Sequence, residues 1–263
     1  MTVSRQMIEA GWRLIENDLT DGTTGNISVR LDGSSLLITP SRRDYRVLTE
    51  RDLVRVEMRS GRAEGRWKPS SEWRLHVAVY QARPDVMAVV HHHATWATAV
   101  AVARKSIPVL IDEAADIGEI PTAPYAASAS SELAEAAARE LEKGRNAILL
   151  ANHGALVVGR DLAEAMRRAV GVERLAKIYV GAEILGGAHG LDEAQVEESR
   201  RFFASYRGMT SGAPEFAHTA PAIVGPVGVR DLVTYSFRAG ITLASLLNAL
   251  ILQKLQKPEH RDN

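Results

Sequence analysis

The sequence predicts an α/β fold in which helices pack against a central mixed sheet. Short aliphatic runs alternate along the chain with segments that carry apolar residues at helical spacing. Two strands follow one another across a tight turn, as in a hairpin. The 263 residues, 46% of them hydrophobic and 24% charged, are enough to bury a substantial core. Hairpins combined with alternating strands and helices favour a mixed sheet over a purely parallel one.

The first half of the chain is predicted to contain a helix, paired strands and a second helix. The first helix ends at residues 17–21, where Asp and Gly accumulate. The turn Asp32-Gly33-Ser34-Ser35 joins two strands as a hairpin. Pro69-Ser70-Ser71-Glu72 opens the second helix, and Pro84 ends it after Arg83. The predicted strands of this half span residues 26–30, 36–39, 53–57 and 61–67.

The second half alternates strands and helices. Apolar runs that precede His91 and His153 predict buried strands. Asp161 followed by Glu164 resembles the capping box that begins many helices. The predicted strands span residues 86–91, 108–111, 147–151 and 155–158, and the predicted helices span 95–103, 128–143 and 161–185.

The composition changes after Arg207. Residues 209–229 are rich in Gly, Pro, Ala and Thr and form a predicted connector. Asp231 to Lys257 has apolar residues at helical spacing and predicts an amphipathic helix that packs on the core or on another subunit. We therefore expect a domain of residues 1–207 and a C-terminal helical extension of residues 208–263.

Charge and cysteine content exclude several classes of protein. Lys plus Arg and Asp plus Glu both number 32, so there is no net basic charge to attract nucleic acid or an anionic membrane. The absence of cysteine rules out disulfides and thiolates and leaves His and carboxylate as metal ligands. The N-terminus lacks the apolar segment of a secretory signal, and no run approaches the roughly 18 apolar residues of a membrane span. These features predict a cytoplasmic protein.

Histidines at strand ends predict a metal site. Because side chains alternate along a strand, His91 and His93 point to one face while His92 points to the other. His153, in Asn-His-Gly at another strand end, supplies a third imidazole. Three protein ligands with an open fourth position are typical of a catalytic metal site. The remaining histidines are predicted to be packing or surface residues: His76, His189, His218 and His260.

Three further motifs combine a structural explanation with a functional one. Ser70 or Ser71 caps a helix, and the same hydroxyls and spare N–H groups suit a phosphate, with Glu72 as a base beside the metal. Thr23-Thr24-Gly25-Asn26 forms a turn whose hydroxyl and amide groups suit an oxyanion. Thr39-Pro40-Ser41-Arg42-Arg43 adds a hydroxyl and two guanidinium groups, which pair with phosphate.

In order and spacing, these motifs resemble the class II aldolase/adducin family, in particular its L-fuculose-1-phosphate aldolase group, over roughly residues 5 to 207. The resemblance implies a three-layer α/β/α fold with a mixed, largely antiparallel sheet, so that residues 1–207 form a class II aldolase-like catalytic domain. The matching motifs are Thr24-Gly25-Asn26, Ile38-Thr39-Pro40-Ser41, Pro69-Ser70-Ser71-Glu72, His91-x-His93, Ala123-Pro124-Tyr125 and Asn152-His153-Gly154.

The same resemblance implies a set of ligands and roles. One divalent metal per subunit, usually zinc, would bind the three histidines, although imidazole also accepts manganese, cobalt or iron. Glu72 would be the acid/base. The family also implies a homotetramer in which Tyr206 reaches a neighbouring subunit's site. The residues expected to hold the substrate phosphate are Thr24, Gly25, Asn26, Ser41, Arg42, Ser70 and Ser71.

Two departures from the family pattern bear on the substrate. Arg42 stands where the family usually has Gly, which adds a cation or narrows the site. Asp112-Glu113 stands where the fuculose enzyme has a second tyrosine, so these two carboxylates are the candidates for catalysis at that position. The group that protonates the aldehyde oxygen, and the aldehyde itself, are therefore open.

The resulting hypothesis is reversible cleavage of a ketose 1-phosphate, either fuculose-1-phosphate or a deoxy- or methylthio-pentulose phosphate, to dihydroxyacetone phosphate and an aldehyde. Alternatives within the fold are a 4-epimerase, a sugar-phosphate decarboxylase and a dehydratase. The family's epimerases typically have Asp where this chain has Glu72, and its decarboxylases tend to have Lys-Glu in place of Ser71-Glu72. An adducin-like non-catalytic interaction module is a further alternative, but such a module would have lost the histidines.

Overall fold

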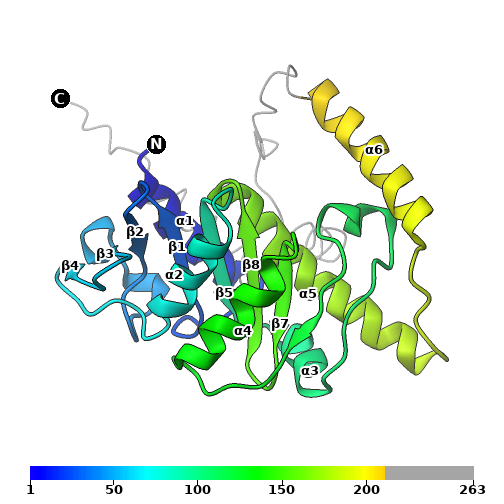
Figure 1. The fold of residues 1–263 in the computed structure, drawn as a ribbon, viewed down its shortest axis with the longest axis horizontal. Coiled ribbons are helices and arrows are strands. Elements are labelled where there is room, and N and C mark those ends of the chain that lie inside the picture. Colours follow the sequence, from blue (N-terminus) through cyan, green and yellow to red (C-terminus); the bar gives the residue numbers. More distant parts are fainter. Residues whose placement is uncertain (211–263) are drawn as a thin grey trace, which may run out of the picture. The chain divides into compact units, whose positions relative to one another are not determined.

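An eight-stranded mixed sheet lies at the centre of the computed structural model, which describes residues 1–210 (Figure 1). The strand order is β4-β3-β2-β1-β5-β8-β7-β6, and neighbouring strands are antiparallel except for the parallel pair β6–β7. This confirms the predicted largely antiparallel sheet. The strands are β1 (Asn26–Arg30), β2 (Ser35–Ile38), β3 (Val54–Glu57), β4 (Ala63–Glu64), β5 (Ala88–His92), β6 (Thr122–Ala123), β7 (Ala147–Leu150) and β8 (Gly154–Gly159).

Helices cover both faces of the sheet, which confirms the three-layer α/β/α fold (Figure 1). One apolar cluster packs α1, α3 and α5 against one face, and a second packs α2 and α4 against the other. A sixth helix contacts the 3-10 turn η3 (Asp112–Asp116). The helices are α1 (Val3–Glu16), α2 (Trp73–Ala82), α3 (Thr95–Val102), α4 (Ser131–Leu141), α5 (Leu162–Ile184) and α6 (Glu193–Thr210).

The alternation of β5 decides which layer each histidine faces. Val89 belongs to the apolar cluster with α2 and α4, whereas Ala88 and Val90 belong to the cluster with α1, α3 and α5. Continuing this alternation, His91 faces the side of α2 and His92 faces the opposite layer. The first residue of the metal motif is thus directed toward the helix that follows Glu72.

Most predicted elements are present, with one clear error. The predicted strand at residues 108–111 is wrong: Pro108 has no amide hydrogen to donate, and only an isolated bridge joins Ile107 to Ile120. The short strand β6, parallel to β7, was not predicted.

The predictions about the C-terminal part of the chain stay untested. The predicted connector beyond Thr210 and the helix at 231–257 lie outside the described residues, so the domain boundary at 207 stays a prediction. Among the helices that are described, none is both long and apolar enough to span a membrane.

Candidate metal centre

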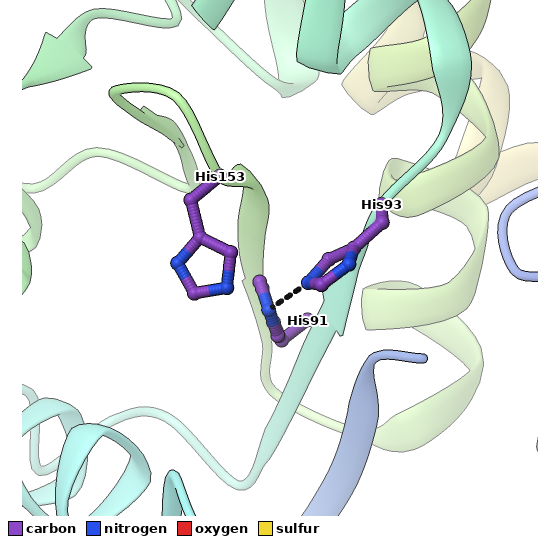
Figure 2. Close-up of side chains that lie close together, drawn as sticks. All are labelled: His91, His93 and His153. Carbon is purple, nitrogen blue, oxygen red and sulfur yellow. Dashed lines mark hydrogen bonds between the residues drawn. The ribbon is translucent and has the colours of Figure 1, made fainter. Parts of the chain in front are cut away.

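Three imidazoles from two separate parts of the chain form one cluster (Figure 2). His91 lies in β5, His93 follows that strand, and His153 lies in the turn between β7 and β8. Their ring centroids are 4.7 to 4.9 Å apart, and one nitrogen from each ring lies within 4.8 Å of the others. His92 points away, as predicted, and its Nδ1 accepts a hydrogen bond from the Ala94 amide at 3.3 Å.

The β7–β8 turn is shaped to bring His153 close to β5. A Cβ at Gly154 would lie 2.4 Å from the carbonyl oxygen of His92, so only glycine allows this approach. Asn152 has a φ of 57°, a left-handed conformation that asparagine tolerates better than most residues. Its side-chain oxygen accepts a hydrogen bond from Arg104 Nη2 at 2.7 Å, which ties down the turn. The position of His153 is therefore determined by backbone geometry on both sides.

Two of these imidazoles, His91 and His93, are held in the neutral form that a metal ion requires. His91 Nδ1 lies 2.9 Å from the carbonyl oxygen of Ala155, which can only accept, so Nδ1 carries the proton and Nε2 a lone pair. His91 Nε2 lies 2.8 Å from His93 Nε2. Burial lowers the pKa of His91 well below its ordinary value. Burial, and then the neighbouring His153, lower the pKa of His93 to about 4.

A buried carboxylate stands beside this cluster. Glu72, which directly precedes α2, places Oε2 3.2 Å from His91 Nε2 and Oε1 3.4 Å from His153 Nε2. Within residues 1–210, Glu72 Oε1 and His153 Nδ1 are buried without a hydrogen-bond partner. Buried polar atoms are normally paired, and neutral imidazoles with an adjacent carboxylate are the donor set of a divalent cation. The residues present therefore fit the predicted metal.

Asn26 connects Glu72 to a residue that sequence reasoning did not place in the site. Asn26 pairs with His91 across β1 and β5, and its Nδ2 donates to Glu72 Oε2 at 3.0 Å. His76, predicted to be a packing or surface residue, is fully buried and hydrogen-bonded to Asn26. One signal could have identified it: His76 follows Glu72 by four residues, which places both on one face of a helix.

The segments predicted to bind phosphate are held together by Thr39. The Ile27 amide donates to Thr39 Oγ1 at 3.1 Å, and the Ser70 amide donates to the carbonyl of Thr39 at 3.1 Å. Ser41 donates its amide to Lys68 at 3.0 Å. The start of β1 at Asn26 and the loops that contain Ser41 and Ser70 are thus adjacent, although the assignment of phosphate to them stays a prediction.

Individual members of the predicted phosphate set differ in exposure and backbone conformation. Ser70 is buried, and its Oγ accepts a hydrogen bond from the Glu72 amide at 3.2 Å, whereas Ser71 is exposed. Thr24 donates to Asp21 from its amide and its hydroxyl, both at 3.1 Å. Arg42 is exposed with a φ of 56°, a conformation that glycine adopts without strain, which agrees with the glycine that the family resemblance implies at this position.

Space for a ligand lies next to the histidines. A cavity of about 860 Å³ is bounded by His93 and Thr24 on one side and by residues of α5, including Glu173 and Lys177, on the other. Glu173 is engaged there, because its carboxylate accepts from the amides of Trp96 and Ala97 at the start of α3. Of the three histidines and Glu72, His93 alone lines this cavity, so the cavity borders the cluster on the His93 side.

The structure does not bring the other predicted catalytic residues to the histidines. Asp112 accepts a hydrogen bond from Ser199 of α6 at 3.1 Å, and Glu113 lines a separate cavity of about 230 Å³. Within residues 1–210, no hydrogen bond or ion pair joins either carboxylate to Glu72 or to the three histidines. Tyr206 falls in α6, but its side chain lies outside the described residues, so its role stays a prediction.

Comparison with known proteins agrees with this geometry. Residues 5–180 match the model of the class II aldolase and adducin N-terminal domain family. The chain belongs to this family. Its resemblance to L-fuculose phosphate aldolases is also confirmed: the enzyme of that name from Escherichia coli K12 is 42% identical over 180 residues, which are 68% of this chain and 82% of that protein.

Two further matches within the class II aldolase family bear on substrate and fold. The 5-methylthioribulose-1-phosphate/5-deoxyribulose-1-phosphate aldolase of Rhodospirillum rubrum is 41% identical over 179 residues, covering 66% of this chain and 78% of that protein. A solved structure of an L-fuculose 1-phosphate aldolase superposes with a TM-score of 0.73 at 37% identity, covering 77% of this chain and 96% of that one.

Proposed function

We propose that this chain is a metal-dependent aldolase that reversibly cleaves a ketose 1-phosphate to dihydroxyacetone phosphate and an aldehyde. The observation that carries the proposal is the position of Glu72. Its carboxylate lies within 3.4 Å of both His91 and His153, and its buried Oε1 has no hydrogen-bond partner among the described residues. Relatives named as aldolases of ketose 1-phosphates support the same reaction.

Each part of the site has one task in this reaction. His91, His93 and His153 would hold the divalent metal, which when bound would supply a Lewis acid for the negative charge of the enediolate that carbon–carbon cleavage leaves. Glu72 takes up and returns the proton that converts this enediolate to dihydroxyacetone phosphate. Asn26, Ser41 and Ser70, together with Thr24, Gly25, Arg42 and Ser71, would bind the phosphate.

The first test is release of dihydroxyacetone phosphate from a panel of ketose 1-phosphates, with and without a chelator. The panel contains fuculose-1-phosphate, 5-deoxyribulose-1-phosphate and 5-methylthioribulose-1-phosphate, because the relatives carry both kinds of name. We expect release that the chelator abolishes and that a divalent metal restores. The matched control is Glu72→Gln, which should retain metal and lose turnover by about 100-fold or more.

Several results would contradict the proposal. Release that persists without metal, or full turnover in Glu72→Gln, would remove the metal or the carboxylate from the mechanism. Carbon dioxide, an epimer or a dehydrated product in place of dihydroxyacetone phosphate would identify one of the alternative reactions of the fold. A purified protein that binds no metal would support an interaction module instead.

Three finer points stay predictions within the proposal. Zinc is preferred on the resemblance, and metal analysis of the purified protein distinguishes it from manganese, cobalt or iron. The homotetramer is checked by light scattering in solution. A cytoplasmic location, without membrane or nucleic-acid partners, follows from composition alone and is checked by fractionation of cells.

A further inference from the structure

A continuous chain of buried hydrogen bonds ends on Glu72. Asn26 Nδ2 donates to Glu72 Oε2 at 3.0 Å, and the side-chain oxygen of Asn26 contacts His76 Nε2. On the other side of the imidazole, His76 Nδ1 lies 2.6 Å from Ser28 Oγ, which in turn lies 2.8 Å from the hydroxyl of Tyr80. All five side chains are buried, so water does not compete for these bonds.

The chemistry of these groups permits one direction of hydrogen bonding. Asn26 presents its amide nitrogen to Glu72 and its oxygen to His76, and an amide oxygen can only accept. His76 Nε2 must then carry the proton, which leaves Nδ1 as the acceptor for the hydroxyl of Ser28. Burial lowers the pKa of His76 to about 3, which keeps the ring in this neutral form. The tautomer of His76 and the orientation of the Asn26 carboxamide therefore determine one another.

We propose that His76 is a positioning residue which, through Asn26, holds Glu72 Oε2 in place and leaves Oε1 as the oxygen that transfers the proton. This inference rests on the proposed function. Oε2 receives the amide hydrogen of Asn26, whereas Oε1 is buried without a hydrogen-bond partner among the described residues. Without the donor at His76, the carboxamide of Asn26 is free to rotate and present its oxygen to the carboxylate, which repels it.

Two variants at position 76 each remove one of the two hydrogen bonds that the imidazole makes. His76→Gln places an amide nitrogen near the position of Nε2, which keeps the donor to Asn26 and removes the acceptor for Ser28. His76→Asn keeps an acceptor for Ser28, but its side chain is too short to reach Asn26. Tyr80→Phe is the control for the loss of one buried hydrogen bond, because it leaves the donor from His76 to Asn26 intact.

We expect His76→Asn to lower kcat by about 10- to 100-fold with little change in KM, because outer partners of a metal site act at about this size. His76→Gln should retain most of kcat, and Tyr80→Phe should resemble the unaltered chain. All three should keep a full complement of metal. The proposal is overturned if Asn and Gln at position 76 have equal kcat, or if the loss falls on KM.

A measurement that needs no substrate separates this inference from the proposed function. Nitrogen-15 NMR of histidine-labelled protein should show His76 protonated at Nε2 and not at Nδ1, with the signal identified by its absence in His76→Gln. The opposite tautomer would overturn the inference whether or not the chain is an aldolase. If the unaltered chain cleaves no ketose 1-phosphate, the proposed function fails, while the tautomer still tests the hydrogen-bond chain.

Discussion

At the scale of single residues, Gly25 lets two strands meet at the metal centre. Its φ is 75°, and a Cβ built on it would lie 2.4 Å from the carbonyl oxygen of His91. Any side chain at this position must therefore push away the backbone of a predicted metal ligand. Gly25 contributes no functional group of its own beyond its backbone, yet it sets the distance between Asn26 and His91.

Gly25→Ala should lower the free energy of unfolding by about 1–3 kcal/mol, because it combines an unfavourable φ with a backbone clash. Denaturant unfolding measures the loss. The matched control is Gly33→Ala, since a Cβ at Gly33 meets nothing within 4 Å, and its effect should stay within about 0.5 kcal/mol. Equal stability of the two variants would show that the approach of β1 to β5 tolerates a side chain.

At the scale of elements, one helix and one strand build the support of the site together. Glu72 precedes α2, and His76 and Tyr80 follow within it at intervals of four residues, so all three lie on one face of the helix. Asn26 and Ser28 are two residues apart on β1 and share one face of the sheet. The two periodicities place the polar face of α2 against the polar face of β1.

The loop that leads into α2 is held by a buried carboxylate. Asp52 lies in the 3-10 turn η2 (Glu50–Asp52); Trp67 Nε1 donates to its Oδ1 at 2.7 Å, and Thr49 Oγ1 donates to its Oδ2 at 2.7 Å. The hydrogen bonds from Trp67 and then Thr49 lower the pKa of Asp52 from 3.8 to about 2. Asp52 thereby ties η2 to the segment that precedes Glu72.

This shift predicts how stability depends on pH. Because the folded pKa lies below that of the unfolded chain, the contribution of Asp52 is present above about pH 4 and is lost as pH falls through about 2. Asp52→Asn should lower the free energy of unfolding by about 1–3 kcal/mol at pH 6, with a gap that narrows below pH 4. Urea unfolding from pH 6 to pH 3 checks this, and a gap independent of pH would contradict it.

At the scale of the whole molecule, the order of strands assembles the site. β1 and β8 lie on either side of β5, so the loops before β1 and before β8 both reach the end of β5 where His91 lies. Asp112 and Glu113, by contrast, belong to η3, which packs against α6. Their action on the aldehyde therefore stays a prediction, as does that of Tyr206, which the predicted homotetramer would supply from a neighbouring copy.

A mixing experiment tests this sharing of residues. If Tyr206 acts in a neighbouring site, Glu72→Gln and Tyr206→Phe each lower activity, and oligomers refolded from a mixture of the two contain some intact sites. We expect the mixture to be more active than the average of the two pure variants, measured as dihydroxyacetone phosphate release. A mixture with only average activity would place both residues in one chain's site, or exclude Tyr206.

Much of the fold follows from local patterns that the chain carries in its sequence. β1 has the predicted bounds, and α5 begins as expected, with Asp161 accepting a hydrogen bond from the Glu164 amide at 2.7 Å. The prediction of a strand at 108–111 was wrong because strand propensity is local and does not indicate whether a partner strand is available. The convergence of His91, His93 and His153 was predicted correctly, because the alternation of side chains along a strand and the positions of the motifs at strand ends are both present in the structure.

The sequence by itself predicted the mixed sheet from its periodicity, and the order and spacing of its motifs resemble one family, which implied the three layers and the three histidines as metal ligands. Only the tertiary structure decided that His76 belongs with Glu72 and that Asp112 and Glu113 do not lie beside the histidines. Such contacts depend on which face of α2 meets β1 and on where η3 packs. Those are consequences of packing between distant segments, and no local pattern encodes them.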